Sequence, residues 1–152
     1  ASTSPLQDIA VNDNGRIYVT VGNDAYMCVI RLDNVDGQWK VVEKQCVKLQ
    51  FGVPGSSVAI SPYGKVVVVT EKGVEIIDIT KKPPTTVKKI AGKGFVRCVF
   101  LADGVTIACT KADGAVVFID SKTGGILKEV KNVCPAGTIR ITPGPGNSEV
   151  TV

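Results

Sequence analysis

Short apolar runs separated by turn residues are the dominant pattern of the chain, and residues 95–131 show it most clearly. Four runs, FVRCVFL, VTIACT, AVVFID and ILKEVK, are separated by Asp-Gly at 103–104, Asp-Gly at 113–114 and SKTGG at 121–125. Asp-Gly between apolar runs is a strong hairpin signal, because glycine adopts positive φ without steric cost. The segment therefore predicts a four-stranded antiparallel sheet, whose faces need similar sheets to cover them.

The same pattern occurs twice earlier in the chain. LQDIAVNDNGRIYVTV, SVAISPYGKVVVVT and RCVFLADGVTIACT each contain an apolar run, a turn ending in glycine and a second apolar run. The turn glycines recur at separations of 49 and 40 residues, and an aspartate after the third run recurs at 45 and 42: Gly15, Gly64 and Gly104, then Asp33, Asp78 and Asp120. Periods of about 40–50 residues are typical of β-propeller blades.

These units predict an all-β protein built from propeller-type, four-stranded antiparallel blades. We expect a single partial propeller domain over residues 1–152, with blades at about 6–48, 56–91 and 95–131 and a half-blade at 138–152. Because a closed propeller needs about 4–8 blades, we expect another polypeptide to complete this one, either a protein partner, a second copy or a further fragment. A β-sandwich or another stacked-sheet array remains the alternative architecture.

Two of the units resemble WD40-type β-propeller repeats. SPYGKVVVVTEKGVEIIDI at 61–79 and LADGVTIACTKADGAVVFIDSKTGGILKEV at 101–130 are similar to the blades of that family, and to the degenerate YVTN and quinoprotein-like repeats. Three aspartates take the place of the family's Trp-Asp aspartate, but leucine or isoleucine precedes each and the chain has no histidine: Asp33, Asp78 and Asp120. The resemblance implies a non-catalytic scaffold for protein–protein interaction.

Composition and charge indicate a globular chain with no nucleic-acid or membrane-spanning function. Hydrophobic residues make up 44% and charged residues 21%, while the net charge of +4 comes from scattered lysines. Aromatic residues make up only 5% and do not alternate with basic ones, so no nucleic-acid partner is expected. No apolar run approaches the ~20 residues of a transmembrane helix, and the first residues lack the pattern of a signal peptide.

The cysteines predict buried thiols rather than a metal site. There are five, without a CxxC spacing and without any histidine, so a structural zinc site is not expected: Cys28, Cys46, Cys98, Cys109 and Cys134. Three of them lie inside apolar runs, where a free thiol behaves as a small hydrophobe. We therefore expect a reducing compartment and a cytoplasmic location, while one disulfide remains an alternative.

The sequence contains no pattern that supports catalysis. Without histidine, neither a Ser-His-Asp nor a Cys-His arrangement can form, and no phosphate-binding loop is present. Residues 12–15, NDNG, resemble part of a calcium loop but lack its ligand spacing, so we expect no metal and no cofactor. An enzyme is therefore the less favoured reading. The alternatives are a small-ligand or metal-binding propeller of lactonase or quinoprotein type, or an exchange factor for a small GTPase.

Three places are candidates for a protein interaction site. Trp39 begins the predicted fourth strand, and exposed tryptophan is enriched in binding hot spots, although a packing role is the alternative. The segment KKPPTT at 81–86 predicts an exposed loop, because two prolines exclude it from central pairing. The junction between the second and third blades is the third place. The candidate residues are Trp39, Lys81, Lys82, Pro83, Pro84, Lys93 and Phe95.

Overall fold

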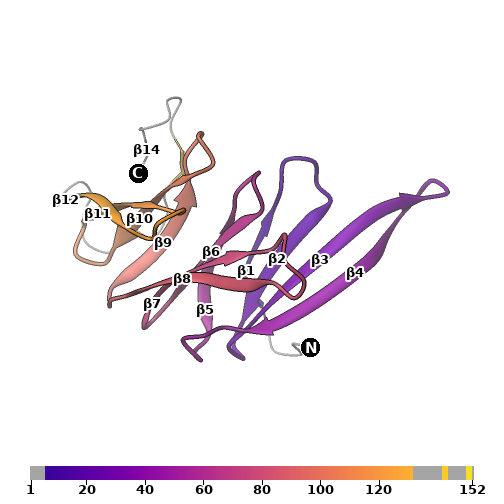
Figure 1. Cartoon of the computed structure of the whole chain (residues 1–152), viewed down its shortest axis with the longest axis horizontal. Coiled ribbons are helices and arrows are strands. Elements are labelled where there is room, and N and C mark those ends of the chain that lie inside the picture. The colour runs from indigo at the N-terminus through magenta and orange to yellow at the C-terminus, as the bar shows by residue number, and fades with distance from the viewer. Residues whose placement is uncertain (1–5, 132–141, 144–149, 152) are drawn as a thin grey trace.

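The structure is a computed structural model that describes residues 6–131, 142–143 and 150–151. It is all-β, as predicted, and contains three four-stranded antiparallel sheets side by side (Figure 1). In each sheet the strands lie in chain order, so each sheet is a meander. The described residues do not form a closed ring, and within them there is no helix long and apolar enough to span a membrane.

The strands have the following bounds. Sheet A contains β1 (Leu6–Val11), β2 (Ile17–Gly22), β3 (Tyr26–Val35) and β4 (Gln38–Lys48). Sheet B contains β5 (Gly55–Ile60), β6 (Lys65–Thr70), β7 (Gly73–Asp78) and β8 (Thr85–Ala91). Sheet C contains β9 (Phe95–Phe100), β10 (Thr106–Lys111), β11 (Val116–Asp120) and β12 (Ile126–Val130). β13 (Thr142–Pro143) pairs with β14 (Val150–Thr151), and the rest of the predicted half-blade at 138–152 lies outside the described residues.

A bulge in the first strand recurs at the same place in all three sheets. The pairing between the first and second strands skips one residue, which is Gln7 in sheet A, Ser56 in sheet B and Val96 in sheet C. A bulge bends its strand and increases the local twist. Because each sheet carries the bulge at an equivalent position, the three sheets are structural repeats of one unit.

The sheets meet mainly through their first two strands. β5 lies against β1 and β2, and β9 lies against β5 and β6. The carboxylate of Asp8 on β1 accepts a hydrogen bond from the backbone N–H of Val58 on β5, at 2.9 Å. The same carboxylate lies 3.5 Å from the Arg97 guanidinium on β9. One side chain therefore links the first strands of all three sheets.

Alternation along the strands gives each sheet two apolar faces, and two clusters fill the spaces between sheets. The cluster between sheets A and B consists of Val19, Val21, Met27, Val29, Leu49, Val58, Val66, Val68, Ile77 and Ile79. The cluster between sheets B and C consists of Val67, Val69, Val74, Ile76, Cys98, Phe100, Ile107, Cys109, Val117 and Ile119. Sheet B thus buries both faces, which explains the unbroken apolar run KVVVVT in β6.

Four of the five cysteines form two disulfides, so the expectation of free thiols is wrong for these four. Cys28 pairs with Cys46 and Cys98 pairs with Cys109. Both pairs are directly opposite one another on neighbouring antiparallel strands, with Cα atoms 4.0 and 4.1 Å apart. Only the strand register brings these cysteines together, and the spacing along the chain does not reveal it.

A buried carboxylate fixes the connection between sheets A and B. Glu75 on β7 has no exposed surface, and its two oxygens accept hydrogen bonds from the backbone N–H groups of Gln50 and Phe51, at 3.0 and 2.8 Å. The Thr86 hydroxyl donates a further bond to it at 3.0 Å. A buried carboxylate is tolerated where hydrogen bonds replace its hydration in this way.

Replacing Glu75 with alanine should lower the free energy of unfolding by about 2–4 kcal/mol, because two backbone donors lose their acceptor inside the protein. Urea unfolding at neutral pH measures this loss. Glu71→Ala is the matched control, since Glu71 is exposed in the neighbouring turn and should change stability by less than about 0.5 kcal/mol. Equal losses in the two variants would contradict the role given to Glu75.

Candidate functional site

Six turns gather at one end of the three sheets, which we call the rim. In each antiparallel meander, the turn between the first and second strands and the turn between the third and fourth lie at the same end. The rim therefore contains the three turns that end in Gly15, Gly64 and Gly104, together with the β3–β4, β7–β8 and β11–β12 turns.

The β3–β4 hairpin projects from the rim as an arm. Its strands contain 10 and 11 residues, whereas the equivalent strands contain 6 and 7 in sheet B and 5 and 5 in sheet C. Figure 1 shows the arm at the right-hand end of the molecule. At its tip, Asp36 and Gly37 both have positive φ, at 54° and 84°, which is the geometry of a two-residue type I′ turn. The arm is therefore a regular hairpin with a defined tip.

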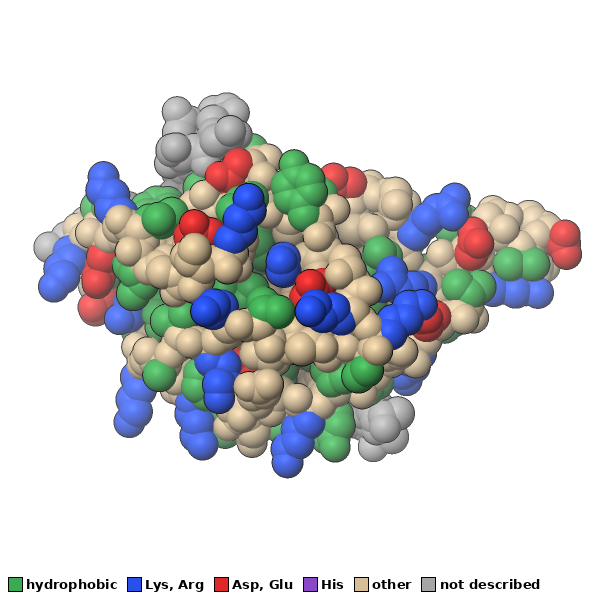
Figure 2. Space-filling model, in the orientation of Figure 1, with side chains coloured by type: hydrophobic (Ala, Val, Ile, Leu, Met, Phe, Trp, Pro, Cys, Tyr) green, Lys and Arg blue, Asp and Glu red, His purple; other side chains and the backbone are tan. Residues whose placement is uncertain are grey.

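The arm exposes large apolar side chains. Trp39 is 55% exposed, and Val41 and Val42 on the same strand are 60% and 57% exposed. Hydrophobic and charged side chains lie together on this part of the surface (Figure 2). Single exposed apolar side chains are ordinary, but three within four residues of one hairpin form a patch.

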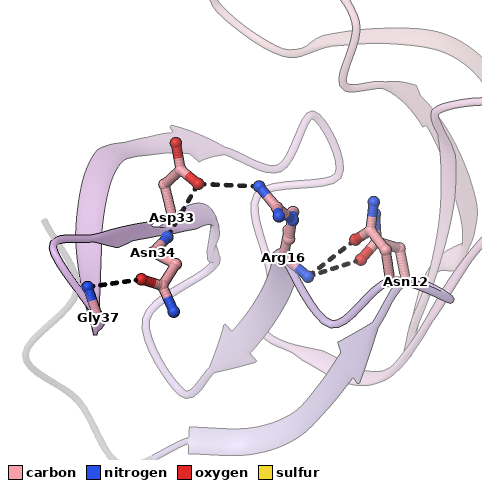
Figure 3. Close-up of polar contacts among 6 residues, drawn as sticks. Asn12, Arg16, Asp33, Asn34 and Gly37 are labelled. Atoms are coloured by element: carbon pink, nitrogen blue, oxygen red, sulfur yellow. Dashed lines mark hydrogen bonds and ion pairs between the residues drawn. The ribbon is translucent and has the colours of Figure 1, made fainter.

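Arg16 holds the base of the arm. Its guanidinium lies 2.8 Å from the Asp33 carboxylate and 5.5 Å from the centre of the Trp39 ring. The Asn12 side chain accepts a hydrogen bond from the Arg16 backbone N–H, and Asn34 accepts one from the N–H of Gly37 (Figure 3). Asp33 was expected to end the third strand, as Asp78 and Asp120 do, but here β3 continues past it to Val35.

A second charged group ties sheet A to sheet B at the rim. Glu43 on β4 accepts hydrogen bonds from Lys82 at 2.9 Å and from Arg31 at 2.7 Å. Arg31 also donates to the backbone carbonyl of Ile79 in sheet B, at 3.1 Å. The hydrogen bonds from Lys82 and Arg31 lower the pKa of Glu43 below its usual value of 4.5, because they stabilise the ionised carboxylate.

The described residues border three shallow hollows at the rim. The first, of about 250 Å³, lies at the base of the arm beside Arg16, Asp33 and Val42. The second, of about 300 Å³, lies between sheets A and B beside Arg31 and Tyr63. The third, of about 360 Å³, lies between sheets B and C, and Tyr63 borders it as well. The hollows therefore form a row from the arm to sheet C.

The structure divides the predicted interaction residues between the two ends of the sheets. Trp39 and residues 81–84 lie at the rim, where Lys81, Lys82 and Pro83 are exposed and Pro84 is buried. Lys93 and Phe95 lie at the opposite end, where sheet C begins. There the Phe95 ring is half-buried, with the Lys111 ammonium 5.2 Å from its centre. The seven residues therefore do not form one site.

The outer face of sheet A is a feature that sequence reasoning missed. By strand register, Ile9 is equivalent to Val58 in sheet B and Cys98 in sheet C. The last two are 6% and 3% exposed, because sheets A and B cover them, whereas Ile9 is 55% exposed. Val11 is likewise 47% exposed, although its equivalents, Ile60 and Phe100, pack in the two cores. The alternation in LQDIAV was visible in the sequence, but which face is covered was not.

The exposed side chains of the arm continue this outer face. The register places Val11, Tyr18 and Ile30 in one row across sheet A. Leu32 and Asn34 follow on the same side of β3, opposite Val41 and Trp39. The outer face and the arm therefore form one continuous surface, in which Lys44 lies beside Ile30 and Arg16 lies over the Trp39 ring. Its apolar residues are what we call the docking face: Ile9, Val11, Tyr18, Ile30, Leu32, Trp39 and Val41.

Neither metal ligation nor sequence comparison gives this surface a known role. Within the described residues, no group of three or more cysteine, aspartate or glutamate side chains is placed to hold a metal ion. No model of a known protein family matches the chain, and no curated protein matches its sequence. The geometry of the sheets and the rim is therefore the basis for a function.

The lowered pKa of Glu43 gives a direct test of the network at the rim. A carbon-detected NMR titration should place the midpoint of its carboxyl below 4.5. Lys82→Met should move the midpoint upward, because it removes the largest of the favourable hydrogen bonds. The stabilisation from this network should be present above pH 4.5 and disappear as the pH falls through the lowered pKa. An unchanged midpoint in Lys82→Met would show that this contact is absent in solution.

Proposed function

We propose that the protein is a non-catalytic interaction scaffold, a partial propeller that another polypeptide completes by placing a sheet on the docking face. One observation carries this proposal. Ile9 and Val11 are exposed at register positions that the neighbouring sheet covers in sheets B and C. A face that repeats the pattern of two covered faces is suited to a sheet of the same kind, from a second copy or from a different chain.

The energetics favour covering this face. Fully burying a valine or isoleucine side chain contributes about 1.5–3 kcal/mol relative to leaving it exposed. Ile9 and Val11 are each about half exposed, so covering the two contributes roughly 2 kcal/mol before Trp39 and Val41 are counted. The type I′ tip and the Arg16–Asp33 ion pair hold the arm in place, which reduces the entropy lost on binding.

The propeller and the WD40-like resemblance remain part of the proposal. Three repeated sheets joined through their first strands, with one side chain linking all three, support radial packing rather than a sandwich of two sheets. No described feature favours the enzyme or the exchange-factor alternatives over the scaffold. The proposal includes no cofactor and no nucleic-acid partner.

The disulfides change the expected location. Disulfides persist in oxidising compartments and are rare in the cytosol. Two of them, Cys28–Cys46 and Cys98–Cys109, lie between paired strands of this chain. We therefore infer that the protein works in an oxidising compartment, in place of the cytoplasmic location that the apparent lack of disulfides suggested. Mass spectrometry after alkylation without reduction, on protein from its native source, tests this inference. The four paired cysteines should stay unmodified, and their alkylation would contradict it.

Charge placed on the docking face should abolish association. Light scattering at several concentrations should show the full chain associating, with itself or with an added partner. Ile9→Lys combined with Val11→Lys should prevent that association, because lysine cannot be buried there without a partner charge. Leu127→Lys is the matched control, since Leu127 is 60% exposed on β12 and lies outside the docking face. A chain that stays monomeric and soluble, both alone and with an added partner, and keeps Ile9 and Val11 exposed would contradict the proposal.

Trp39 should contribute to binding and little to folding. It is the only tryptophan, so its fluorescence reports on the arm, and its emission should shift to shorter wavelength as the docking face is covered. Trp39→Ala should weaken association by at least about tenfold, as is typical of a hot-spot tryptophan. The unfolding free energy should fall by less than about 1 kcal/mol, because an exposed side chain loses mainly its contact with Arg16. A loss of several kcal/mol would instead make Trp39 a core residue.

A further inference from the structure

The hollow between sheets B and C is lined by two lysines that form no ion pair with a described carboxylate. The arginines that line the other two hollows, Arg16 and Arg31, each form one. The lining residues of the hollow between sheets B and C are Tyr63, Lys65, Asp103, Gly104, Val105, Ser121 and Lys122. Its volume of about 360 Å³ lies within the range of small-molecule sites, which is roughly 300–1,000 Å³. Both of the sheets that form it belong to this chain, so it does not rest on the proposed function.

The lysine that follows the turn glycine in sheet B is paired differently from the arginine at the same place in sheet A. A cation follows the turn glycine in sheets A and B, where it is Arg16 and Lys65 respectively. Arg16 forms an ion pair with Asp33, at 2.8 Å. Lys65 instead lies opposite Asp78 in the strand pairing, and the Asp78 carboxylate accepts its hydrogen bonds from the N–H and hydroxyl of Thr80. Among the described residues, neither Lys65 nor Lys122 forms an ion pair within 4 Å, although Lys65 lies close enough to Asp78 for its charge to stabilise that carboxylate.

The one carboxylate in the hollow is already occupied. Asp103 accepts hydrogen bonds from the backbone N–H groups of Val105 and Thr106, at 2.9 and 2.8 Å, and from the Thr106 hydroxyl at 2.7 Å. Burial raises the pKa of Asp103, but these hydrogen bonds outweigh it and leave the pKa below its usual value of 3.8. The carboxylate is therefore ionised and committed to its own turn. The lining therefore contains two lysines and one carboxylate, and that carboxylate is held by its own turn rather than by either lysine.

The walls of the hollow are fixed before any ligand arrives. The buried Ser61 hydroxyl donates a hydrogen bond to the Gly104 carbonyl at 2.7 Å, which joins the turns of sheets B and C. The Tyr63 ring packs on Gly104, where a Cβ atom would lie only 2.7 Å from the ring, and Gly104 also has a φ of 68°. Tyr63 nevertheless remains 67% exposed, so its ring is held beside the hollow and is accessible from solvent.

We propose that this hollow binds small aromatic oxyanions, such as aryl phosphates. Lys65 and Lys122 provide charge-assisted hydrogen bonds to the oxyanion, and the Tyr63 ring provides a flat surface for the aromatic part of the ligand. Val105 adds an apolar wall. Both features are needed: inorganic phosphate lacks the ring and phenol lacks the charge, so each should bind more weakly than phenyl phosphate.

Titration of the full chain with phenyl phosphate, followed by NMR or calorimetry at low ionic strength, tests this site. We expect saturable binding that weakens at least about fivefold in Lys65→Gln, in Lys122→Gln and in Tyr63→Ala. Inorganic phosphate and phenol should each bind at least about fivefold more weakly than phenyl phosphate. Lys48→Gln is the matched control, because Lys48 is exposed at the other end of β4 and should leave binding unchanged.

Three results would overturn the proposal. The first is that binding of phenyl phosphate does not saturate by about 10 mM. The second is that inorganic phosphate binds as tightly as phenyl phosphate. The third is that Lys48→Gln weakens binding as much as Lys122→Gln. Lys122 is exposed, so Lys122→Gln should fold and still tests the site if the half-buried Lys65 proves necessary for folding. Loss of this binding leaves the docking face on sheet A untouched, so the two proposals fail separately.

Discussion

The constraint on which the structure depends is that each meander has two apolar faces and can cover neither by itself. Alternation in β6 places Val66 and Val68 toward sheet A and Val67 and Val69 toward sheet C, and all four are fully buried. Sheet B satisfies the constraint on both faces, whereas sheet A satisfies it on one. The function proposed for the chain follows from that difference, because the open face of sheet A repeats the pattern of the faces that are closed.

Polar groups then fix how the apolar faces meet. Asp8 links the first strands of the three sheets, and Glu75 holds the connection between the first sheet and the second. At the rim, Arg31 reaches from sheet A to the Ile79 carbonyl in sheet B. Hydrophobic burial is non-directional, so these directed contacts are what define the register of one sheet against the next.

The sequence predicts the sheets better than it predicts the surface. Asp-Gly turns and the recurring glycines indicate repeated antiparallel meanders, because both signals are local. The bulges at Gln7, Ser56 and Val96, the length of the arm and the two disulfides depend on which residues lie opposite one another across strands. Asp33 shows this most clearly. It occupies the same place in the sequence repeat as Asp78 and Asp120, yet it lies within a longer hairpin and forms an ion pair with Arg16.

The same distinction applies to the candidate sites. Its place at the start of a strand makes Trp39 a predicted interaction residue. The structure shows that its side chain is exposed, while its role in binding stays a prediction. Ile9 and Val11 look like ordinary core residues in the sequence, and only their buried equivalents in the other sheets identify their exposure as unusual. Lys65 and Lys122 come from different turns, so no linear motif could bring them to one hollow.

The most direct test of the central claim is the solvent accessibility of individual methyl groups, measured by NMR with a soluble paramagnetic agent as protein concentration rises or a partner is added. Val58 serves as the buried reference and Leu127 as the exposed one, at 6% and 60%. The methyl groups of Ile9 and Val11 should move from the behaviour of Leu127 toward that of Val58 as the docking face is covered. If they remain as accessible as those of Leu127 in every assembly the folded chain forms, sheet A has no covering sheet and the account is wrong.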